Sequence, residues 1–548
     1  MLAQQRLPEA AIFFGKLAVN TIQHLRGQLA GLPREAQRAF IQNKTDAYRG
    51  LADLLIGQGR LAEAQQVLAM LKEEEFFDFI RRNAAEDPRR QALEFQPREG
   101  PWSERLQRLI ALSGKLGAEQ VELERRLRLS PTERDQARLA VLVKDSAVAD
   151  AELARFYREV AVALRAAPAG PEANTAVANV KALQQALAAL GPGTVAVHYV
   201  RAEARLNILV TTKDGQVARR VPIRAAELNR MIAAFRRTLR NPRMKPQIAG
   251  RELHAVLIAP IAADLAQAHA RTLMVSLDGT LRYIPLAALH DGERYLVERY
   301  GLALYTEVAR DNVLQRPPAR RSIAGLGLTR AIDGFDALPA VKEELEAIIG
   351  SGRGAIPDEI HLDRDFSAAQ MRRSLENGHP MLHIASHFVF RPGTEAHSFL
   401  LLGDGDRLTL SPIKSDKFDF SHVDLITLSA CETGLGGGRD AQGEEIEGLG
   451  ALVQKQGARG VVATLWPVAD ESTAQLMQSF YRLREVENLT KAEALRQAQL
   501  ALIRGAWAGA ARAPQRGLKA APDSRPTSAG AYAHPYYWAP FILMGNWL

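Results

Sequence analysis

The chain has 548 residues, of which 47% are hydrophobic, and a formal net charge of +8. This length exceeds what one hydrophobic core supports, so we expect three or four domains of about 150 residues each. The single cysteine excludes an intrachain disulfide framework and a cysteine-based zinc cluster. Without a charged-then-apolar leader or an apolar run long enough to cross a bilayer, we expect a soluble cytoplasmic protein with no membrane partner.

The positive charge is scattered along the chain. Most of the excess is Arg in helical stretches that also hold Glu and Asp, as in VELERRLRLSPTERDQARL. There is no dense basic block with interleaved aromatic residues, so we do not expect nucleic-acid binding.

Residues 1–98 are predicted to be helical. In AYRGLADLLIGQGRLAEAQQVLAMLKEEEFFDF, apolar residues recur at helical spacing on both sides of GQGR, which predicts a helix-turn-helix hairpin. The hairpin resembles a tetratricopeptide repeat, with small Ala52 and Ala64 between the helices and Gly59 in the turn, and residues 10–30 resemble half of a preceding repeat. One repeat cannot bury its own apolar face, so other repeats or another surface must cover it. An ordinary helical hairpin remains the alternative.

Two segments follow the helical repeat region. Residues 99–190 carry long Arg/Glu-rich amphipathic runs and are predicted to form a helical connecting arm. Residues 191–318 are predicted to form an N-terminal α/β part, because TVAVHYVRAEARLNILVTTKDGQVARRVPI alternates apolar and polar residues around a KDG turn. The Pro- and Arg-rich RPPARR at 316–321 marks a linker.

Residues 319–548 alternate regularly between short apolar strands and helices. The predicted strands are IAGLGL, EIHLD, PMLHIAS, VDLITLSA, GVVATLW and PFILMGN. The predicted helices include SAAQMRRSLEN, where Ser367 and Gln370 are spaced as a capping box. This alternation implies a parallel sheet covered on both faces, in one α/β domain. Low-complexity residues 506–530 are expected to form a mobile surface loop within it.

Two reactive side chains directly follow predicted strands. His387 follows MLHIAS and Cys431 follows LITLSA, so a parallel sheet would bring an imidazole and a thiol to the same edge. A nearby His can activate a thiol, and the separation of 44 residues, from 387 to 431, is near the spacing of about 50 in caspase-type peptidases. A lone cysteine is more often a buried, inert residue.

Other interpretations of the same region are weaker. His379, His383 and His387 would stack as metal ligands on a helix, but Pro380 and the apolar MLHIA favour a strand, where such residues lie roughly 13 Å apart. We therefore expect no metal and no other cofactor, and we interpret His383 as a core histidine. The glycines of GLGGGRDAQGEE lack the lysine and Ser/Thr of a phosphate-binding loop.

Four motifs in order, HIASHF, LSACETG, GVVATLWPV and HPYYWAPFILMGN, resemble the CHAT family. This is a caspase-like, separase-related group of cysteine peptidases that is often joined to tetratricopeptide repeats. The resemblance runs from about residue 190 to 548 and implies a caspase-like fold. It also implies a catalytic dyad in which His387 is the general base and Cys431 attacks the scissile carbonyl to form a thioester.

The resemblance also implies an oxyanion hole made by the backbone N–H groups of Phe388 and Cys431. Many caspase-like peptidases have Gly at the position of Phe388, and a bulky residue tolerates fewer backbone dihedrals. We therefore expect an activity that could stay latent until a partner reshapes the site.

The expected substrate pocket follows the strand after the cysteine, in VVATLWPVADES. Asp470 and Glu471 lie there, and Glu444 and Glu445 lie in the loop after Cys431. Carboxylates in this pocket would favour a basic P1 residue, which would make the Arg-rich segments candidate self-cleavage sites. A helix N-terminal charge pattern and a solvated loop explain the four acids equally well.

Two functions remain open. The first is a caspase-like endopeptidase that cleaves a protein substrate and is controlled by a protein regulator bound to its helical repeats. The second is a catalytically silent scaffold that acts by binding. The resemblance suggests a bacterial role in regulated proteolysis or defence, and the sequence leaves the oligomeric state, the activating signal and calcium control undefined.

Overall fold

The computed structural model describes residues 7–26, 44–80, 92–166, 172, 174–306, 312–318, 322–332, 334–349, 358–389, 398–414, 418–430, 447–466, 468, 470–505 and 531–548. The chain separates into two compact units. The first comprises residues 1–71 and 82–181, and the second comprises residues 72–81 and 182–548. The two units are described in turn.

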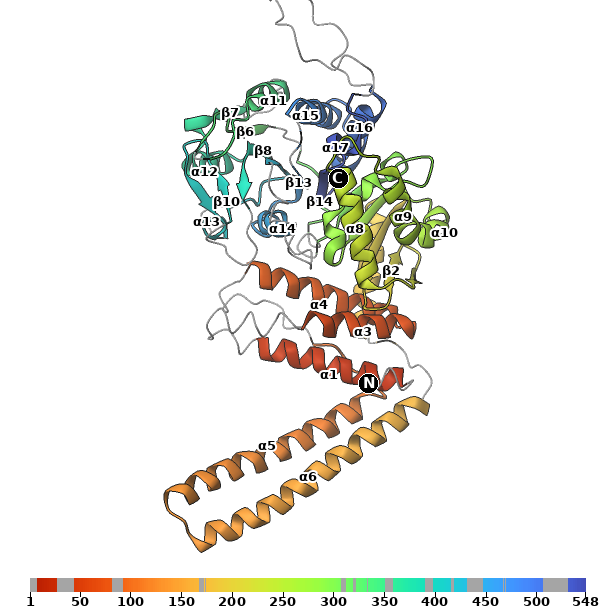
Figure 1. Cartoon of the computed structure of the whole chain (residues 1–548), viewed down its shortest axis with the longest axis vertical. Helices are drawn as coiled ribbons and strands as arrows, with labels where there is room; N and C mark the ends of the chain where they lie inside the picture. The colour runs from red at the N-terminus through yellow and green to blue at the C-terminus, as the bar shows by residue number, and fades with distance from the viewer. Residues whose placement is uncertain are drawn as a thin grey trace, which may run out of the picture. The chain divides into compact units, whose positions relative to one another are not determined.

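The first unit is helical, as predicted. Its helices, two of which continue into the second unit, are α1 (Pro8–Arg26), α3 (Thr45–Gly57), α4 (Leu61–Ile80), α5 (Gly100–Leu129), α6 (Glu133–Ala166) and α7 (Asn174–Ala189). α3 and α4 form the predicted hairpin, and Gly59 in its turn has a φ of 72°, which favours glycine. α5 and α6 form a second, much longer antiparallel hairpin (Figure 1). The tetratricopeptide resemblance itself stays a prediction.

A buried ionic network ties the helices of the first unit together. Lys16 of α1 lies 2.8 Å from Glu99, which precedes α5, and Arg60, which precedes α4, lies 2.8 Å from the other Glu99 oxygen. Glu63 of α4 contacts both cations. Burial alone would raise the pKa of Glu99, but Lys16 and Arg60 lower it, so the carboxylate stays charged. Losing one partner would leave a buried charge uncompensated.

The second unit is built on one eleven-stranded sheet with the order β3-β2-β1-β4-β5-β14-β13-β12-β8-β6-β7. Its strands are β1 (Thr194–Arg201), β2 (Leu206–Thr211), β3 (Gln216–Val221), β4 (Thr272–Ser276), β5 (Gly301–Leu304), β6 (Ile323–Gly327), β7 (Glu359–Leu362), β8 (Met381–Ser386), β12 (Leu425–Ala430), β13 (Gly460–Thr464) and β14 (Phe541–Gly545). A small separate sheet contains β9 (Phe388–Val389), β10 (Phe399–Leu401) and β11 (Arg407–Thr409).

The sheet is mostly parallel, with antiparallel pairing at two places. β7, β6, β8, β12 and β13 pair in parallel, as the alternating pattern predicts, and so do β1, β4, β5 and β14. β14 runs antiparallel to β13, and β1, β2 and β3 form an antiparallel meander. Segments 191–318 and 319–548 therefore contribute to a single sheet, and β14 joins their two halves.

Helices cover the faces of this sheet. They are α8 (Ala225–Leu239), α9 (Gln247–Leu257), α10 (Ala262–Gln267), α11 (Ala340–Ile348), α12 (Ala368–Glu376), α13 (Leu410–Lys414), α14 (Glu447–Lys455), α15 (Asp470–Glu485), α16 (Lys491–Arg504) and α17 (Pro535–Trp538). At the start of α12, the Ser367 side chain accepts a hydrogen bond from Gln370 N–H at 3.2 Å, as the capping motif predicts. Short 3₁₀ turns complete the unit: Ala259–Ile261, Gly279–Tyr283, Leu286–Ala288, Leu296–Glu298 and Asp363–Asp365.

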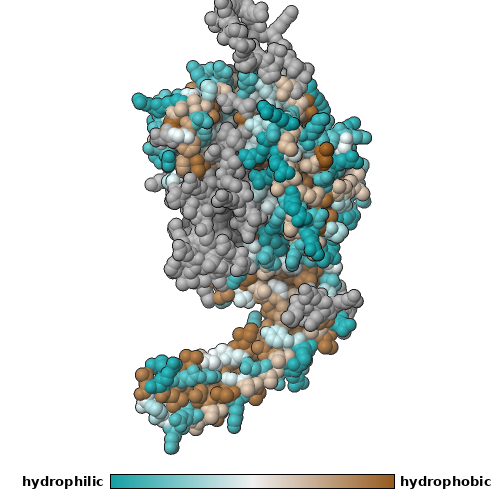
Figure 2. Space-filling model, in the orientation of Figure 1, coloured by the Kyte–Doolittle hydropathy of each residue, from teal (hydrophilic) through white to brown (hydrophobic). Residues whose placement is uncertain are grey.

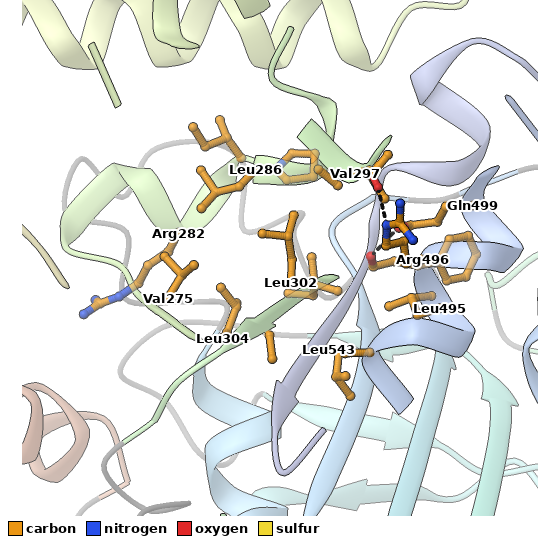
Figure 3. A pocket seen from close by; sticks show the side chains of 17 residues that line it. Val275, Arg282, Leu286, Val297, Leu302, Leu304, Leu495, Arg496, Gln499 and Leu543 are labelled. Atoms are coloured by element: carbon orange, nitrogen blue, oxygen red, sulfur yellow. Dashed lines mark hydrogen bonds between the residues drawn. The ribbon is translucent and has the colours of Figure 1, made fainter. Parts of the chain in front are cut away.

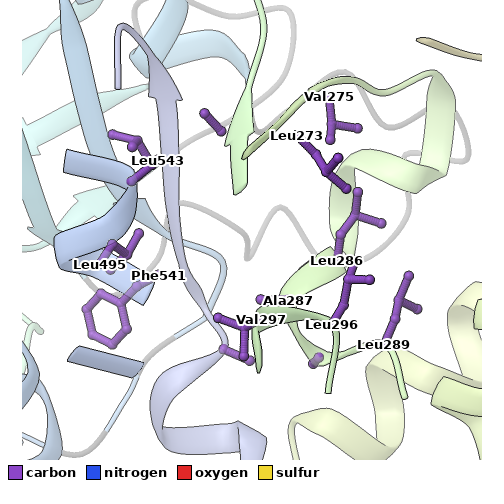
Figure 4. Close-up of a cluster of buried hydrophobic side chains, with 14 of the residues drawn as sticks. Leu273, Val275, Leu286, Ala287, Leu289, Leu296, Val297, Leu495, Phe541 and Leu543 are labelled. Carbon is purple, nitrogen blue, oxygen red and sulfur yellow. The ribbon is translucent and has the colours of Figure 1, made fainter. Parts of the chain in front are cut away.

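The largest hydrophobic core lies on both sides of β14. Figure 4 shows Leu543 and Phe541 of β14 near Leu495 of α16, with Leu273 and Val275 of β4 in the same cluster. A second core, which includes Phe388 and Ile426, lies between β8, β12 and the small sheet. Within the described part of the chain, no helix combines the length and the apolar character that a membrane span needs.

Candidate functional site

The predicted dyad follows two neighbouring strands. β8 and β12 pair in parallel, and their last residues, Ser386 and Ala430, are register partners. His387 is the next residue after Ser386, and Cys431 is the next residue after Ala430 in the sequence. Cys431 itself lies outside the described residues, so its role stays a prediction. The strand register that should bring the two residues to one sheet edge is as predicted.

His387 is buried, and its ring is held on two sides. Its Nε2 lies 2.9 Å from the backbone oxygen of Asp336, and its ring centroid lies 5.1 Å from that of Phe335. A carbonyl oxygen can only accept, so Nε2 carries the proton in this contact. In a neutral imidazole the other nitrogen, Nδ1, then has the lone pair that can accept a proton.

The carbonyl of Asp336 belongs to the loop after β6, a strand that also pairs in parallel with β8. Asp363 anchors this loop by accepting hydrogen bonds from Thr329 N–H at 2.8 Å and Thr329 Oγ1 at 2.7 Å. Partial burial would raise the pKa of Asp363, but these hydrogen bonds lower it below its ordinary value, so the anchor stays ionised. Sequence reasoning missed Asp336, because its contact uses a backbone atom that any residue type provides.

A buried polar network surrounds His383 of β8, the strand that His387 follows. His383 Nε2 lies 3.0 Å from Glu344 of α11, and His383 Nδ1 lies 3.2 Å from the hydroxyl of Tyr481 of α15. That hydroxyl also lies 2.8 Å from Thr427 of β12, the register partner of His383. Burial raises the pKa of Tyr481, so its hydroxyl keeps its proton. The interpretation of His383 as a core histidine is confirmed, and the network joins both site strands to two helices.

The backbone at Phe388 is set by the small sheet. Leu401 N–H donates to His387 C=O at 2.9 Å, and Phe388 is the register partner of Leu400. In an antiparallel ladder, this makes Phe388 and Leu400 a non-hydrogen-bonded pair, so the Phe388 N–H is directed away from β10. The Phe388 side chain is buried in the second core.

The predicted pocket acids are only partly described. Glu444 and Glu445 lie outside the described residues, as does the side chain of Asp470. Asp470 and Glu471 are the first two residues of α15, the position that the helix-charge interpretation expects. Glu471 is exposed and accepts a hydrogen bond from the Tyr532 hydroxyl at 2.8 Å. Their role in a substrate pocket stays a prediction.

The three spaced histidines have separate partners. His379 Nδ1 lies 3.1 Å from Ser322 Oγ, and its Nε2 lies 3.1 Å from Glu359. His383 lies within the strand β8, as expected, and His387 contacts Asp336. Among the residues that the structure describes, no group of three or more His, Cys, Asp or Glu side chains has the arrangement of a metal site.

A cavity elsewhere in the second unit contains none of the predicted site residues. Figure 3 shows it between β4, β5, β14 and α16, with mainly apolar lining. Its polar groups are occupied: Arg496 donates to the carbonyls of Val297 and Glu298 at 2.8 Å, and Gln499 donates to the carbonyls of Trp538 and Phe541. These contacts hold α16 to neighbouring segments.

Comparison with protein families identifies a CHAT domain over residues 247–546. No curated protein matches the chain. The predicted class, a caspase-like α/β domain that follows an all-α region, is confirmed by this match together with the observed sheet.

Similar solved structures include those of a gingipain and of a separase complex. Gingipain R (RgpB), an Arg-specific cysteine proteinase, is 8% identical, with a TM-score of 0.33, and the alignment covers 59% of this chain and 74% of that chain. The complex of the Porphyromonas gingivalis RgpB pro- and mature domains has the same identity and TM-score, with 59% and 76% covered. In the Saccharomyces cerevisiae separase–securin complex the identity is 9%, the TM-score 0.41 and the coverage 96% of this chain and 47% of that chain. Similarities this distant carry no information on activity.

Proposed function

Because the chain belongs to the CHAT-domain family, we propose that it is a caspase-like cysteine endopeptidase with His387 and Cys431 as its catalytic dyad. The observation that carries this proposal is the pairing of Ser386 with Ala430, since each reactive residue directly follows one of them. In parallel strands, such residues gather at one sheet edge.

The chemistry follows from the state of His387. Its Nδ1 takes the proton of the Cys431 thiol, and the thiolate attacks the carbonyl carbon of the scissile peptide. The imidazolium then gives this proton to the departing amine as the C–N bond breaks, leaving a thioester. Water hydrolyses the thioester and regenerates the thiol. The contact with Asp336 supports this assignment, because it orients the ring and leaves Nδ1 as the base.

The tetrahedral oxyanion needs donors, for which we propose the N–H groups of Phe388 and Cys431. The register of β9 and β10 supports the first of these, since it directs the Phe388 N–H away from β10. A glycine could rotate this peptide easily, whereas the buried Phe388 side chain resists rotation. If the Phe388 N–H does not face the oxyanion in this conformation, the oxyanion hole can form only after the small sheet rearranges.

The proposed substrate is a protein, cleaved after a basic residue if Asp470, Glu471, Glu444 and Glu445 line the pocket. The proposed biological role is regulated proteolysis, with a protein regulator that acts through the helical first unit. The alternative is a CHAT scaffold without catalysis, which would bind proteins through the same surfaces.

A covalent probe tests the proposal directly. Because Cys431 is the only cysteine, a peptidyl electrophile with Arg at P1 can label a single thiol, and intact mass spectrometry counts the adduct. We expect labelling of the wild type, none of Cys431→Ala, and a loss of about 100-fold or more in the labelling rate of His387→Ala. Labelling that is equally fast in His387→Ala at pH 7 would show an ordinary exposed thiol and contradict the dyad. A matching P1 Asp probe separates the specificity proposal from the catalytic one.

A further inference from the structure

The long hairpin of α5 and α6 is an antiparallel pair with two different flanks. Its seam is apolar, with Leu106 of α5 and Phe156 and Val160 of α6 in one buried cluster. One flank carries interhelical ion pairs, Arg105 with Glu159 at 2.6 Å and Arg138 with Glu119 at 2.8 Å. Between the described residues of α5 and α6, no ion pair of this kind lies on the other flank.

That other flank is buried near the first residues of α5 and the last residues of α6, which we call the base of the hairpin. It is exposed further along both helices. Residues seven apart lie on the same side of a helix in such a pair. In α5, Ser103 is 5% exposed and Ile110 is 57% exposed. In α6, Leu164 is 2% exposed, Tyr157 47% and Val143 52%. One continuous stripe on each helix therefore changes from core to surface along the hairpin.

Helix α1 covers the base of this flank. Phe14 of α1 lies 5.4 Å from Tyr157, ring centroid to ring centroid, and Ala10 and Phe13 pack into the cluster with Leu106 and Leu164. α1 thus packs against the base of the hairpin, chiefly on α6. Beyond α1 the described residues leave the surface between α5 and α6 uncovered, and hydrophobic residues are visible along the hairpin in Figure 2.

The uncovered part has the composition of a helix-packing surface. We call it the distal flank, defined by seven exposed residues: Ile110, Gly114, Gly117, Val121, Val143, Ala147 and Ala154. Small residues allow another helix to approach closely. Two carboxylates lie on the same stripes: Glu124, seven residues after Gly117, and Asp150, seven residues after Val143.

A basic edge borders the flank on the α6 side. Lys144, Arg158 and Arg165 recur at multiples of seven residues, and all three are exposed. None of them forms an ion pair with a described residue, whereas Arg105, Arg125, Arg138 and Arg155 do. Other cations of the hairpin that also lack an ion pair with a described residue include Arg108, Lys115 and Arg134. Unpaired cations along an apolar stripe favour a partner with acidic side chains beside its own apolar face.

We propose that the distal flank binds an amphipathic helix of a protein partner, acidic along the edge that meets Lys144 and Arg158. This helix would pack on the hairpin beyond α1 and complete a three-helix arrangement. The inference concerns binding and holds whether or not Cys431 is catalytic.

The test uses a defined probe and the full chain. A fluorescein-labelled 21-residue helical peptide carries Leu and Ala on one face and Glu along one edge, and fluorescence anisotropy reports its binding. We expect micromolar affinity, weakened about tenfold or more by Ile110→Asp/Val143→Asp and by Lys144→Glu/Arg158→Glu. Val148→Asp is the matched control, because this exposed valine lies on the opposite flank at a similar height, and it should bind like the wild type.

Two further peptides and one measurement complete the design. A peptide of the same composition with scrambled sequence should not bind, and one with Lys in place of Glu should bind at least tenfold more weakly. Circular dichroism shows that each variant keeps its helix content. The proposal is overturned if the acidic peptide does not bind, if the scrambled one binds equally, or if the flank variants bind normally. It is also overturned if sedimentation shows a dimer of the full chain that Ile110→Asp/Val143→Asp abolishes, since the occupant is then a second copy.

Discussion

The buried hydroxyl of Tyr481 offers a sharp test of how the site strands are held. Tyr481→Phe removes one oxygen and leaves two buried groups without their partner: Thr427 Oγ1, 2.8 Å away, and His383 Nδ1, 3.2 Å away. A buried polar group that loses its hydrogen bond costs about 1–3 kcal/mol. Losses within one hydrogen-bond network do not simply add, so we expect a total loss of about 2–3 kcal/mol rather than the full sum.

The assay is equilibrium urea unfolding followed by tryptophan fluorescence, with the midpoint compared at an unchanged slope. Tyr300→Phe is the matched control, because Tyr300 is half-buried in the same unit and its hydroxyl has no hydrogen bond to the described residues. We expect its free energy of unfolding to change by less than about 0.5 kcal/mol. An equally small loss for Tyr481→Phe would refute the reasoning that the network stabilises β8 and β12.

Two further predictions concern buried charge. Asp424→Asn should lower the free energy of unfolding by about 3–5 kcal/mol at pH 7, because the buried Lys491 and Arg484 both contact this carboxylate. Burial lowers the pKa of Lys491 to about 8, so the loss should be smaller at pH 9, where the amine is neutral, and equal losses would contradict it. At Glu359, partial burial is outweighed by histidine hydrogen bonds that lower its pKa to about 2. Its stabilising effect is thus fully present above about pH 4.5 and is lost as the pH falls through 2. Glu359→Gln should therefore lower the free energy of unfolding by about 1–2 kcal/mol at pH 6 and by about a quarter of that at pH 2.5 in urea titrations.

The sequence predicts the strands of the site well because they are short, apolar and bounded by helices. β8 and β12 appear within a residue or two of their predicted limits, and His387 follows the first of them as expected. Periodicity indicates which residues are buried but not which residues they contact, so it could not indicate that Glu344 and Tyr481 lie beside His383. The antiparallel direction of β14 was equally hidden, since an apolar run is the same in both directions.

The long hairpin illustrates the same limit. Its amphipathic runs predict helices, but a heptad stripe does not show where a neighbouring helix stops covering it. Leu164 is buried because it packs with Ala10 and Phe13 of α1, whereas Ile110 and Val143 lie outside this cluster and are exposed. Sequence could therefore predict the arm and its helices, whereas its uncovered surface needed the three-dimensional arrangement.

The position of β14 has a consequence for biosynthesis. The ribosome completes β5 and β13 well before residues 541–545, yet these residues form the strand that lies between the two. Until they emerge, the nascent chain carries two half-sheets with open edges, which is the state most exposed to aggregation and to chaperones. A stop codon or proteolytic cut only a few residues before Phe541 would thus do more than shorten the chain, because β5 and β13 would both lose the strand that pairs with them.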